Sequence, residues 1–134
     1  METRTIGELV ASGAIREIQD GNHGELHPKA SEYVDDGIPF VMASDLKDGR
    51  LNLEEAKKLR KSRTDRLRIG FARAGDVLLT HKGTVGLVAI VPEIVDYVML
   101  TPQVTYYRVN ADKLDAHYLA LAFRTPDMLP NGPR

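Results

Sequence analysis

Residues 75–86 read Gly-Asp-Val-Leu-Leu-Thr-His-Lys-Gly-Thr-Val-Gly, and this stretch decides the type of fold. Its centre, residues 76–80, is short, apolar and bounded by turn residues, which is typical of a buried β-strand. Residues 81–84 form a tight polar connection into the β-branched run at residues 85–91. The stretch therefore predicts two neighbouring strands joined by a loop that carries polar side chains.

Further strands are predicted on both sides of this stretch, at residues 14–18, 38–42, 97–100 and 103–109. Pro39 places its strand at a sheet edge or makes it a strand start, because proline cannot donate to a ladder. A short helix is expected at residues 6–10. A second helix is expected near the C-terminus, capped by Asp112 and ended by Pro126.

Tyr106 and Tyr107 are neighbours on one of these predicted strands. Successive side chains of a strand point to opposite faces of its sheet. We therefore expect one tyrosine in the core and the other exposed.

The positive charge of the chain is concentrated in residues 57–68, which hold seven basic residues and one acid, a net charge of +6. The whole chain has a net charge of -1, so the remainder is acidic. Asn52 has the N-cap position and Glu55 the capping-box spacing, which predicts a helix from residue 52 to about residue 68. A solvated surface helix is one interpretation. We prefer a helix that faces phosphate.

The predicted class is α+β, with a mixed or antiparallel small sheet, an inserted basic helix and a C-terminal helix. A length of 134 residues fits one domain, with a core at about residues 6–124 and a tail at residues 125–134. The composition is that of a soluble protein, and no apolar run is long enough to span a bilayer. The chain has no cysteine and no secretion signal at its N-terminus, so we expect a cytoplasmic protein without a membrane partner.

The sequence carries none of the usual catalytic constellations, such as phosphate-binding loops, dinucleotide loops or a nucleophile elbow. His23 and His27 have the spacing of a helical metal pair, but Gly24 and Pro28 disfavour a helix there. Asp76 begins a strand, where a nuclease carboxylate could lie, yet no acid-x-lysine strand follows it. We therefore expect no enzymatic activity, no metal and no cofactor.

Three polar loops and the basic run are candidate nucleic-acid contacts. Lysine and threonine bind phosphates or base edges, histidine donates and accepts, and glycine lets the backbone come close. Ordinary polar turns are the alternative interpretation of the loops. The candidate loop residues are Asn22, His23, Gly24, Ser44, Lys47, His81, Lys82 and Thr84. The candidate phosphate-binding residues are Lys57, Lys58, Lys61, Arg63 and Lys82.

Four blocks of the chain, at residues 18–24, 37–41, 43–46 and 75–86, strongly resemble successive blocks of the target recognition domains of type I restriction-modification specificity subunits. The last block is the most specific, and the resemblance extends from about residue 6 to residue 124.

The resemblance implies a non-catalytic domain that reads one half of a split target in double-stranded DNA. The complete subunit carries two such domains separated by long helices, and it assembles with modification (methyltransferase) and restriction subunits. This chain ends before a spacer helix, so we expect a fragment or a truncated product. Base-reading residues differ between members of the family, so the resemblance does not name them.

Two other functions stay open from the residues alone. The basic helix could dock on an acidic protein, and titration with short duplexes would separate this from DNA binding. The chain could also be a small nuclease of a restriction system, which magnesium-dependent cleavage of plasmid would reveal. Neither function explains the ordered family blocks.

Overall fold

The computed structural model describes residues 6–21, 28–47, 49–67, 70–81, 86–93 and 96–124. The first half of the chain forms α1 (Ile6–Ala11), β1 (Ile15–Asp20), the 3₁₀ turn η1 (Ala30–Glu32), β2 (Tyr33–Val34), β3 (Ile38–Val41), the 3₁₀ turn η2 (Ala43–Asp45), β4 (Leu46–Lys47), β5 (Arg50–Leu51) and β6 (Lys57–Leu59). The second half forms α2 (Lys61–Thr64), β7 (Phe71–Arg73), β8 (Val77–Thr80), β9 (Val88–Ile90), β10 (Tyr97–Leu100), β11 (Val104–Val109) and α3 (Ala116–Arg124). The expected tail, residues 125–134, lies outside the described residues.

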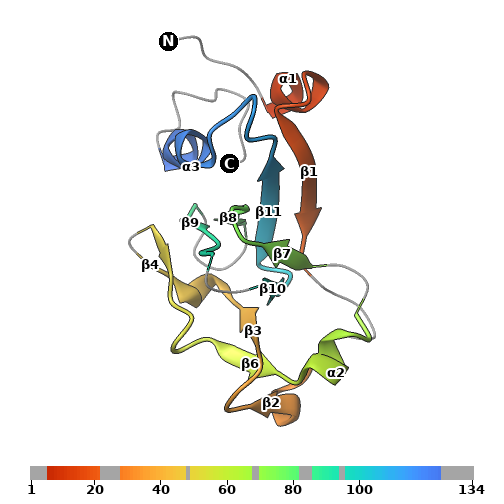
Figure 1. The fold of residues 1–134 in the computed structure, drawn as a ribbon. Coiled ribbons are helices and arrows are strands. Elements are labelled where there is room, and N and C mark those ends of the chain that lie inside the picture. The colour runs from red at the N-terminus through yellow and green to blue at the C-terminus, as the bar shows by residue number, and fades with distance from the viewer. Residues whose placement is uncertain are drawn as a thin grey trace.

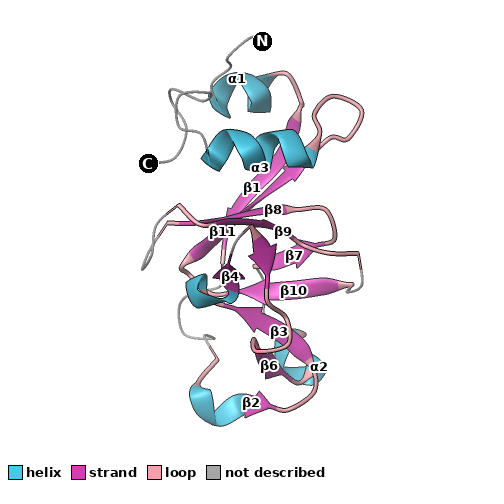
Figure 2. Cartoon of the chain, turned by 90° about the vertical axis from the view of Figure 1, so that its left-hand side faces the viewer, coloured by secondary structure: helices cyan, strands magenta, loops and turns pink. Residues whose placement is uncertain are grey.

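The described residues form two main sheets and the small antiparallel pair β4-β5, with helices at both ends of the molecule (Figure 1). The first sheet has the order β1-β11-β8-β9 and is antiparallel throughout. The second has the order β2-β6-β3-β10-β7, in which only β3 and β10 are parallel among the described strands. The turned view also places α1 and α3 beside the first sheet and α2 beside β6 at the far end (Figure 2). The α+β class with a small mixed sheet is therefore confirmed.

Alternating side chains of β8 divide the interior into two hydrophobic clusters. Val77 and Leu79 lie with Leu119 of α3 in the cluster between the first sheet and the helices. Leu78 points the other way and packs with Leu100 of β10 in the cluster between the two sheets. All of these side chains are buried, as a strand enclosed on both faces requires. The buried strand predicted at residues 76–80 is therefore confirmed.

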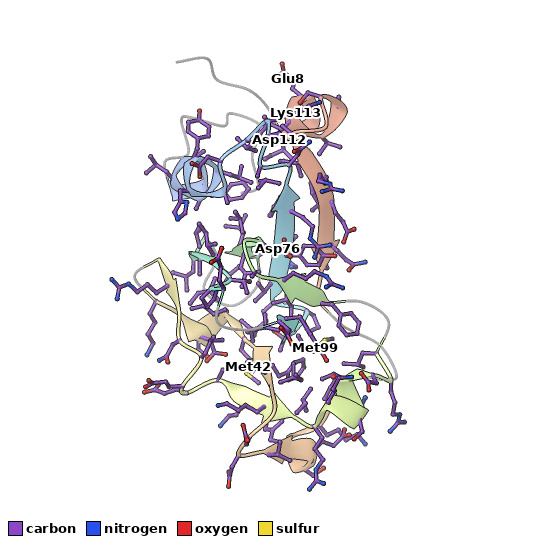
Figure 3. The ribbon with its side chains drawn as sticks, viewed as in Figure 1. Glu8, Met42, Asp76, Met99, Asp112 and Lys113 are labelled. Atoms are coloured by element: carbon purple, nitrogen blue, oxygen red, sulfur yellow. The ribbon has the colours of Figure 1, made fainter. Side chains whose placement is uncertain are left out.

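The helix predicted over residues 52–68 is wrong in its extent. β6 occupies part of this range and pairs with both β2 and β3, while α2 has only four residues. Leu59 of β6 is fully buried with Phe40 and Met99 in a third cluster of the second sheet. Figure 3 labels Met99 near the centre of this sheet. Burial of Leu59 in strand geometry outweighs the small helix propensities of the neighbouring lysines and arginines.

Two predicted helix caps also behave differently. Asn52 Oδ1 accepts the N–H of Glu55 at 3.4 Å, but it closes a turn that no helix continues. At the other end of the chain, α3 begins after Asp115, whose Oδ1 accepts the N–H of His117 at 2.7 Å. This bond has N-cap geometry, so Asp115 and not Asp112 caps α3.

Both strand tyrosines are core residues, so the expected exposed tyrosine is a wrong prediction. Tyr106 is 2% exposed and Tyr107 is 6% exposed. They do point to opposite faces, because Tyr106 packs between the sheets and Tyr107 packs toward the helices. The ring of Tyr107 lies 4.8 Å from that of Phe123. The sequence could not reveal that α3 covers this face.

Pro39 is the second residue of β3, which lies inside the second sheet and not at its edge. β10 pairs with Phe40 and Val41 only, so its pairing with β3 begins one residue after the proline. The missing N–H therefore interrupts no bond with β10. The strand-start alternative is confirmed, and the edge alternative is wrong.

Candidate functional site

Gln103 joins two of the predicted polar loops. Its backbone oxygen accepts the N–H of His81 at 3.0 Å, and its side-chain Oε1 accepts the N–H of Ala43 at 3.0 Å. His81 directly follows β8, and Ala43 begins the 3₁₀ turn η2. The end of β8 and the start of η2 therefore meet at one residue in the connection between β10 and β11.

The end of β1 reaches the same part of the molecule. Thr105 Oγ1 donates to Asp20 Oδ1 at 2.6 Å, and this carboxylate oxygen lies 3.6 Å from His81 Nε2. Gly21 lies so close to Thr101 that a Cβ atom would stand 1.8 Å from the threonine carbonyl oxygen. The last residues of β1 and β8 are therefore held together beside the β10–β11 connection.

We call this surface the polar edge and define it by Asp20, Ser44, His81 and Gln103. Asp20, Ser44 and Lys47 are exposed, while His81 and Gln103 are half-buried. The other predicted loop residues, Asn22, His23, Gly24, Lys82 and Thr84, lie outside the described residues. Their loops leave the described chain at Gly21 and His81, which both lie at the polar edge.

Lys57 is coupled by charge to the same region. Asp45 is 8% exposed, and its Oδ2 accepts the N–H of Met42 at 2.9 Å. Burial raises the pKa of Asp45, while the Met42 hydrogen bond and the nearby Lys57 and Lys47 ammonium groups oppose the rise. The side chain of Lys57 is exposed and makes no hydrogen bond or salt bridge with the described part of the chain. It is thus a cation beside the polar edge that is available to a ligand.

Lys58 is oriented differently, because successive strand residues face opposite sides. Its Nζ donates to the carbonyl oxygens of Glu54 at 3.4 Å and Ala56 at 3.2 Å. Lys58 is half-buried, whereas Lys57 is exposed. The two lysines of β6 therefore do not form one continuous basic stripe.

The two predicted cations of α2 already have acidic partners. Lys61 Nζ lies 3.0 Å from Asp65 Oδ1, and both side chains are mostly exposed. The hydrogen bond that Lys61 donates to the Asp65 carboxylate raises the pKa of Lys61. Arg63 is 11% exposed and pairs through Nε with the Glu32 carboxylate. The positive charges of this run therefore do not line one helix face. Several of them already bind separate acceptors elsewhere in the domain.

A buried polar network supports the first sheet behind the polar edge. Arg108 donates through Nε to Asp76 Oδ1 at 3.0 Å and through Nη2 to Oδ2 at 2.8 Å. Asp76 Oδ2 also accepts the N–H of Arg73 at 2.8 Å. Figure 3 shows Asp76 near the centre of the molecule. The carboxylate once considered as a nuclease ligand is thus engaged in holding β7, β8 and β11 together.

Among the described residues, no three histidine, cysteine, aspartate or glutamate side chains lie close enough together to hold a metal ion. No helix in the described ranges has the length and apolar character needed to cross a bilayer.

Asp20 and Gln103 are not among the site residues predicted from the sequence. Gln103 follows Thr-Pro between two predicted strands, so its position in a connection was visible in the sequence. Nothing in the sequence indicates its two bonds, because Ala43 lies 60 positions away. Asp20 looked like an ordinary loop acid until its contacts with Thr105 and His81 were known.

No protein-family model and no curated protein matches the chain. Solved structures do match. The HsdS subunit from Thermoanaerobacter tengcongensis aligns with a TM-score of 0.61 and 20% identity over 83% of this chain and 25% of that chain. A chain from a structural study of complex assembly and conformational transition of the type I R-M system aligns with a TM-score of 0.59 and 19% identity over 96% of this chain and 30% of that chain. The present chain therefore has the fold predicted by its resemblance to type I specificity subunits, and it spans under a third of the chains it matches.

Proposed function

We propose that this chain is a target recognition domain that binds double-stranded DNA and reads its sequence without chemistry of its own. The domain would comprise residues 6–124 and would belong to the specificity subunit of a type I restriction-modification system. The shared fold supports the domain type. The polar edge supports a binding role, because loops held by a rigid sheet are common sites of recognition.

The observation that carries the proposal is that two strand ends and one turn meet beside the β10–β11 connection. His81 after β8 and Ala43 of η2 both bond to Gln103, and Gly21 after β1 lies close to Thr101. The polar loops that begin at Gly21 and His81 therefore start from the same part of the molecule as the η2 turn. One DNA groove could therefore contact all three.

The side chains at the polar edge suit base recognition. Gln103 uses its side-chain oxygen for Ala43, and its amide N–H groups donate to no other described residue. Carboxylates such as that of Asp20 accept from cytosine N4, and hydroxyls such as that of Ser44 serve as donor or acceptor. In the proposal, these residues and His81 act together with Asn22, His23, Gly24, Lys82 and Thr84.

Phosphate contacts would supply most of the affinity. Lys47 and Lys57 are the leading candidates, because both are exposed and both act on Asp45. Lys61 can exchange Asp65 for a phosphate, since an exposed ion pair contributes little. Lys58 and Arg63 stay in the proposal as cations that would first have to give up part of their present bonds.

The partners are part of the same proposal. In a complete subunit in the cytoplasm, a second recognition domain would read the other half of the target. Modification (methyltransferase) and restriction subunits would then carry out methylation and cleavage. The chain would need no cofactor, because the partner subunits would supply the chemistry.

The proposal is tested by selecting duplexes from a random pool with this chain fused to a dimerising helix, because two half-site readers raise apparent affinity. We expect enrichment of one short sequence, and tighter binding of that sequence than of a scrambled duplex. His81→Ala and Ser44→Ala should relax the selected sequence, with about 1 to 3 kcal/mol of discrimination lost for each good base contact.

Asp112→Ala serves as the control, since this exposed residue lies near α1, at the other end of the first sheet from the polar edge (Figure 3). An unenriched pool together with no duplex binding at low salt would contradict the proposal. Magnesium-dependent cleavage of plasmid by the purified chain would replace it with a nuclease function.

A further inference from the structure

Three arginines are spaced three residues apart around α2. The N–H of Arg63 donates to the carbonyl oxygen of Arg60 at 2.9 Å, and the N–H of Arg66 donates to that of Arg63 at 3.2 Å. The segment also makes the i to i+4 bonds of an α-helix, and residues three apart are neighbours on a helix surface. The backbone therefore brings Arg60, Arg63 and Arg66 to the same side of the chain.

These arginines line a surface hollow of about 440 Å³, together with Glu32, Ser31 and Ser62. The hollow lies where η1 and α2 meet, at the end of the molecule remote from α1 and α3 (Figure 1). Apart from Tyr33, the ionisable groups of its lining are three guanidinium groups and one carboxylate. The lining therefore has an excess of two positive charges.

Glu32 holds the middle arginine in place. Its Oε2 accepts from Arg63 Nε, and its Oε1 accepts the N–H of Lys29 at 3.0 Å. The Arg63 hydrogen bond is the main cause of the lowered pKa of Glu32, so the carboxylate is ionised at neutral pH. The side chains of Arg60 and Arg66 are exposed and make no hydrogen bond or salt bridge with any described residue. They are therefore the two cations of the hollow that can take a ligand.

The chemistry of the hollow suits a phosphate group. Guanidinium groups bind phosphate oxygens with paired N–H donors, and serine hydroxyls add further donors. The volume far exceeds that of one small ion, since a water molecule occupies about 30 Å³ in the liquid. The hollow can thus admit a phosphate that is part of a larger chain.

The position of the hollow points to the DNA backbone as the source of that phosphate. β6 leads directly from Lys57, beside the polar edge, to Arg60, which is three residues further on. Three residues of extended chain cover roughly 10 Å, and each DNA strand carries one phosphate per roughly 3.4 Å along the axis. At that spacing, the phosphates next to one bound at Lys57 lie within the distance that separates Lys57 from Arg60, so the same duplex is the nearest source of phosphate for the hollow.

We propose that Arg60 and Arg66, with Arg63 positioned by Glu32, form a binding site for a phosphate of the DNA backbone in this hollow. This inference rests on the proposed function, since DNA supplies the ligand. It adds two residues and one site to the contacts named above. Arg63 acts here as the fixed centre of the site and not as an independent phosphate contact.

The test compares the salt dependence of duplex binding in the wild type, in the double variant Arg60→Ala/Arg66→Ala and in the control Arg16→Ala/Arg73→Ala. The control removes the same charge from exposed arginines of β1 and β7. Loss of two phosphate contacts should lower the slope of log K against log salt by about 1.8. Between about 50 and 200 mM salt, the wild type should then lose roughly 12-fold more affinity than the double variant. The control should keep the wild-type slope.

Three further measurements test the kind of ligand and the role of the charge. In an NMR titration at constant ionic strength, inorganic phosphate should shift the side-chain signals of Arg60 and Arg66. In a competition assay, a poly-glutamate peptide should not displace the duplex. Arg60→Lys/Arg66→Lys should recover the slope, because each lysine keeps its charge, but only part of the affinity.

Each outcome decides between the claims. If the wild type binds duplex but the double variant keeps its full slope, the site is wrong and the proposed function stands. Equal competition by poly-glutamate would replace DNA with an acidic protein as the ligand. If no duplex binds, the proposed function fails. The phosphate titration then decides alone, because unshifted arginine signals overturn the site and shifted signals support it for a phosphate from another source.

Discussion

Arg108 and Asp76 form a bidentate ion pair, with Arg108 Nη2 2.8 Å from Asp76 Oδ2 and Nε 3.0 Å from Oδ1. The Asp76 side chain is 3% exposed, and that of Arg108 is 26% exposed. The pair connects the start of β8 to β11. It therefore stabilises the sheet whose far ends carry the polar edge.

Asp76→Ala should lower the free energy of unfolding by about 3 kcal/mol, the lower end for a broken buried pair, because Arg108 can regain some water. The substitution also leaves the N–H of Arg73 without its acceptor. Asp76→Asn should cost less, since an amide oxygen can still accept one bond. Urea unfolding should show a lower midpoint with an unchanged m-value. A change of less than about 0.5 kcal/mol for Asp76→Ala would contradict a structural role.

Gly21→Ala should disrupt the polar edge. Its Cβ would stand 1.8 Å from the Thr101 carbonyl oxygen and 2.7 Å from the Leu100 carbonyl carbon, so backbone must move. We expect a loss of about 1 to 3 kcal/mol from overpacking, with faster amide hydrogen exchange at Gln103 and weaker DNA binding. Gly75→Ala is the control, because Gly75 has a φ of 90° and no atom near its added Cβ. That variant should be strained but should leave exchange at Gln103 unchanged.

Tyr107 should be the tyrosine that resists ionisation. Burial, helped by the charge of Asp20, raises its pKa from 10.0 to about 12. A raised pKa means that the folded state favours the neutral phenol, so this stabilising contribution is complete below pH 10.0 and is lost as the pH rises toward about 12. Ultraviolet titration of the phenolate should show a late step that Tyr107→Phe removes. A single step near pH 10.0 in the folded wild type would be inconsistent with this burial.

Lys57→Ala should weaken binding to all duplexes alike and lower the salt slope by about 0.9, as expected for one lost phosphate contact. Lys61→Ala should have a smaller effect, because Lys61 already pairs with Asp65. Arg16→Ala is the control for the loss of one exposed charge. Equal slopes for Lys57→Ala and the wild type would remove Lys57 from the interface.

Several elements could be predicted from local sequence because their physics is local. Residues 77–80 alternate between two apolar environments, and such a short apolar run between turn residues is typical of an enclosed strand. Residues 6–10 and the C-terminal apolar repeat indicated helices that α1 and α3 confirm. The positions of two polar loops at strand ends followed from the same reasoning.

The sequence could not predict which strands pair or which distant charged residues form ion pairs. Residues 57–59 contain two lysines, and the residues on both sides of them also have good helix propensity. Pairing with β2 and β3 nevertheless buries Leu59 in a sheet. The basic run looked continuous because net charge counts residues and ignores their partners. Glu32 neutralises Arg63 from 31 positions away, which no local pattern indicates.

The sequence alone determined the α+β class, the buried strand at residues 77–80 and the concentration of positive charge at residues 57–68, since composition and periodicity are properties of neighbouring residues. Only the tertiary structure decided that Gln103 bonds to both His81 and Ala43, and that Arg63 pairs with Glu32. It also decided that the side chains of Arg60 and Arg66 have no hydrogen bond or salt bridge with the described residues. These relationships depend on hydrogen bonds between distant segments. Their geometry exists only after both sheets have folded and brought the segments together.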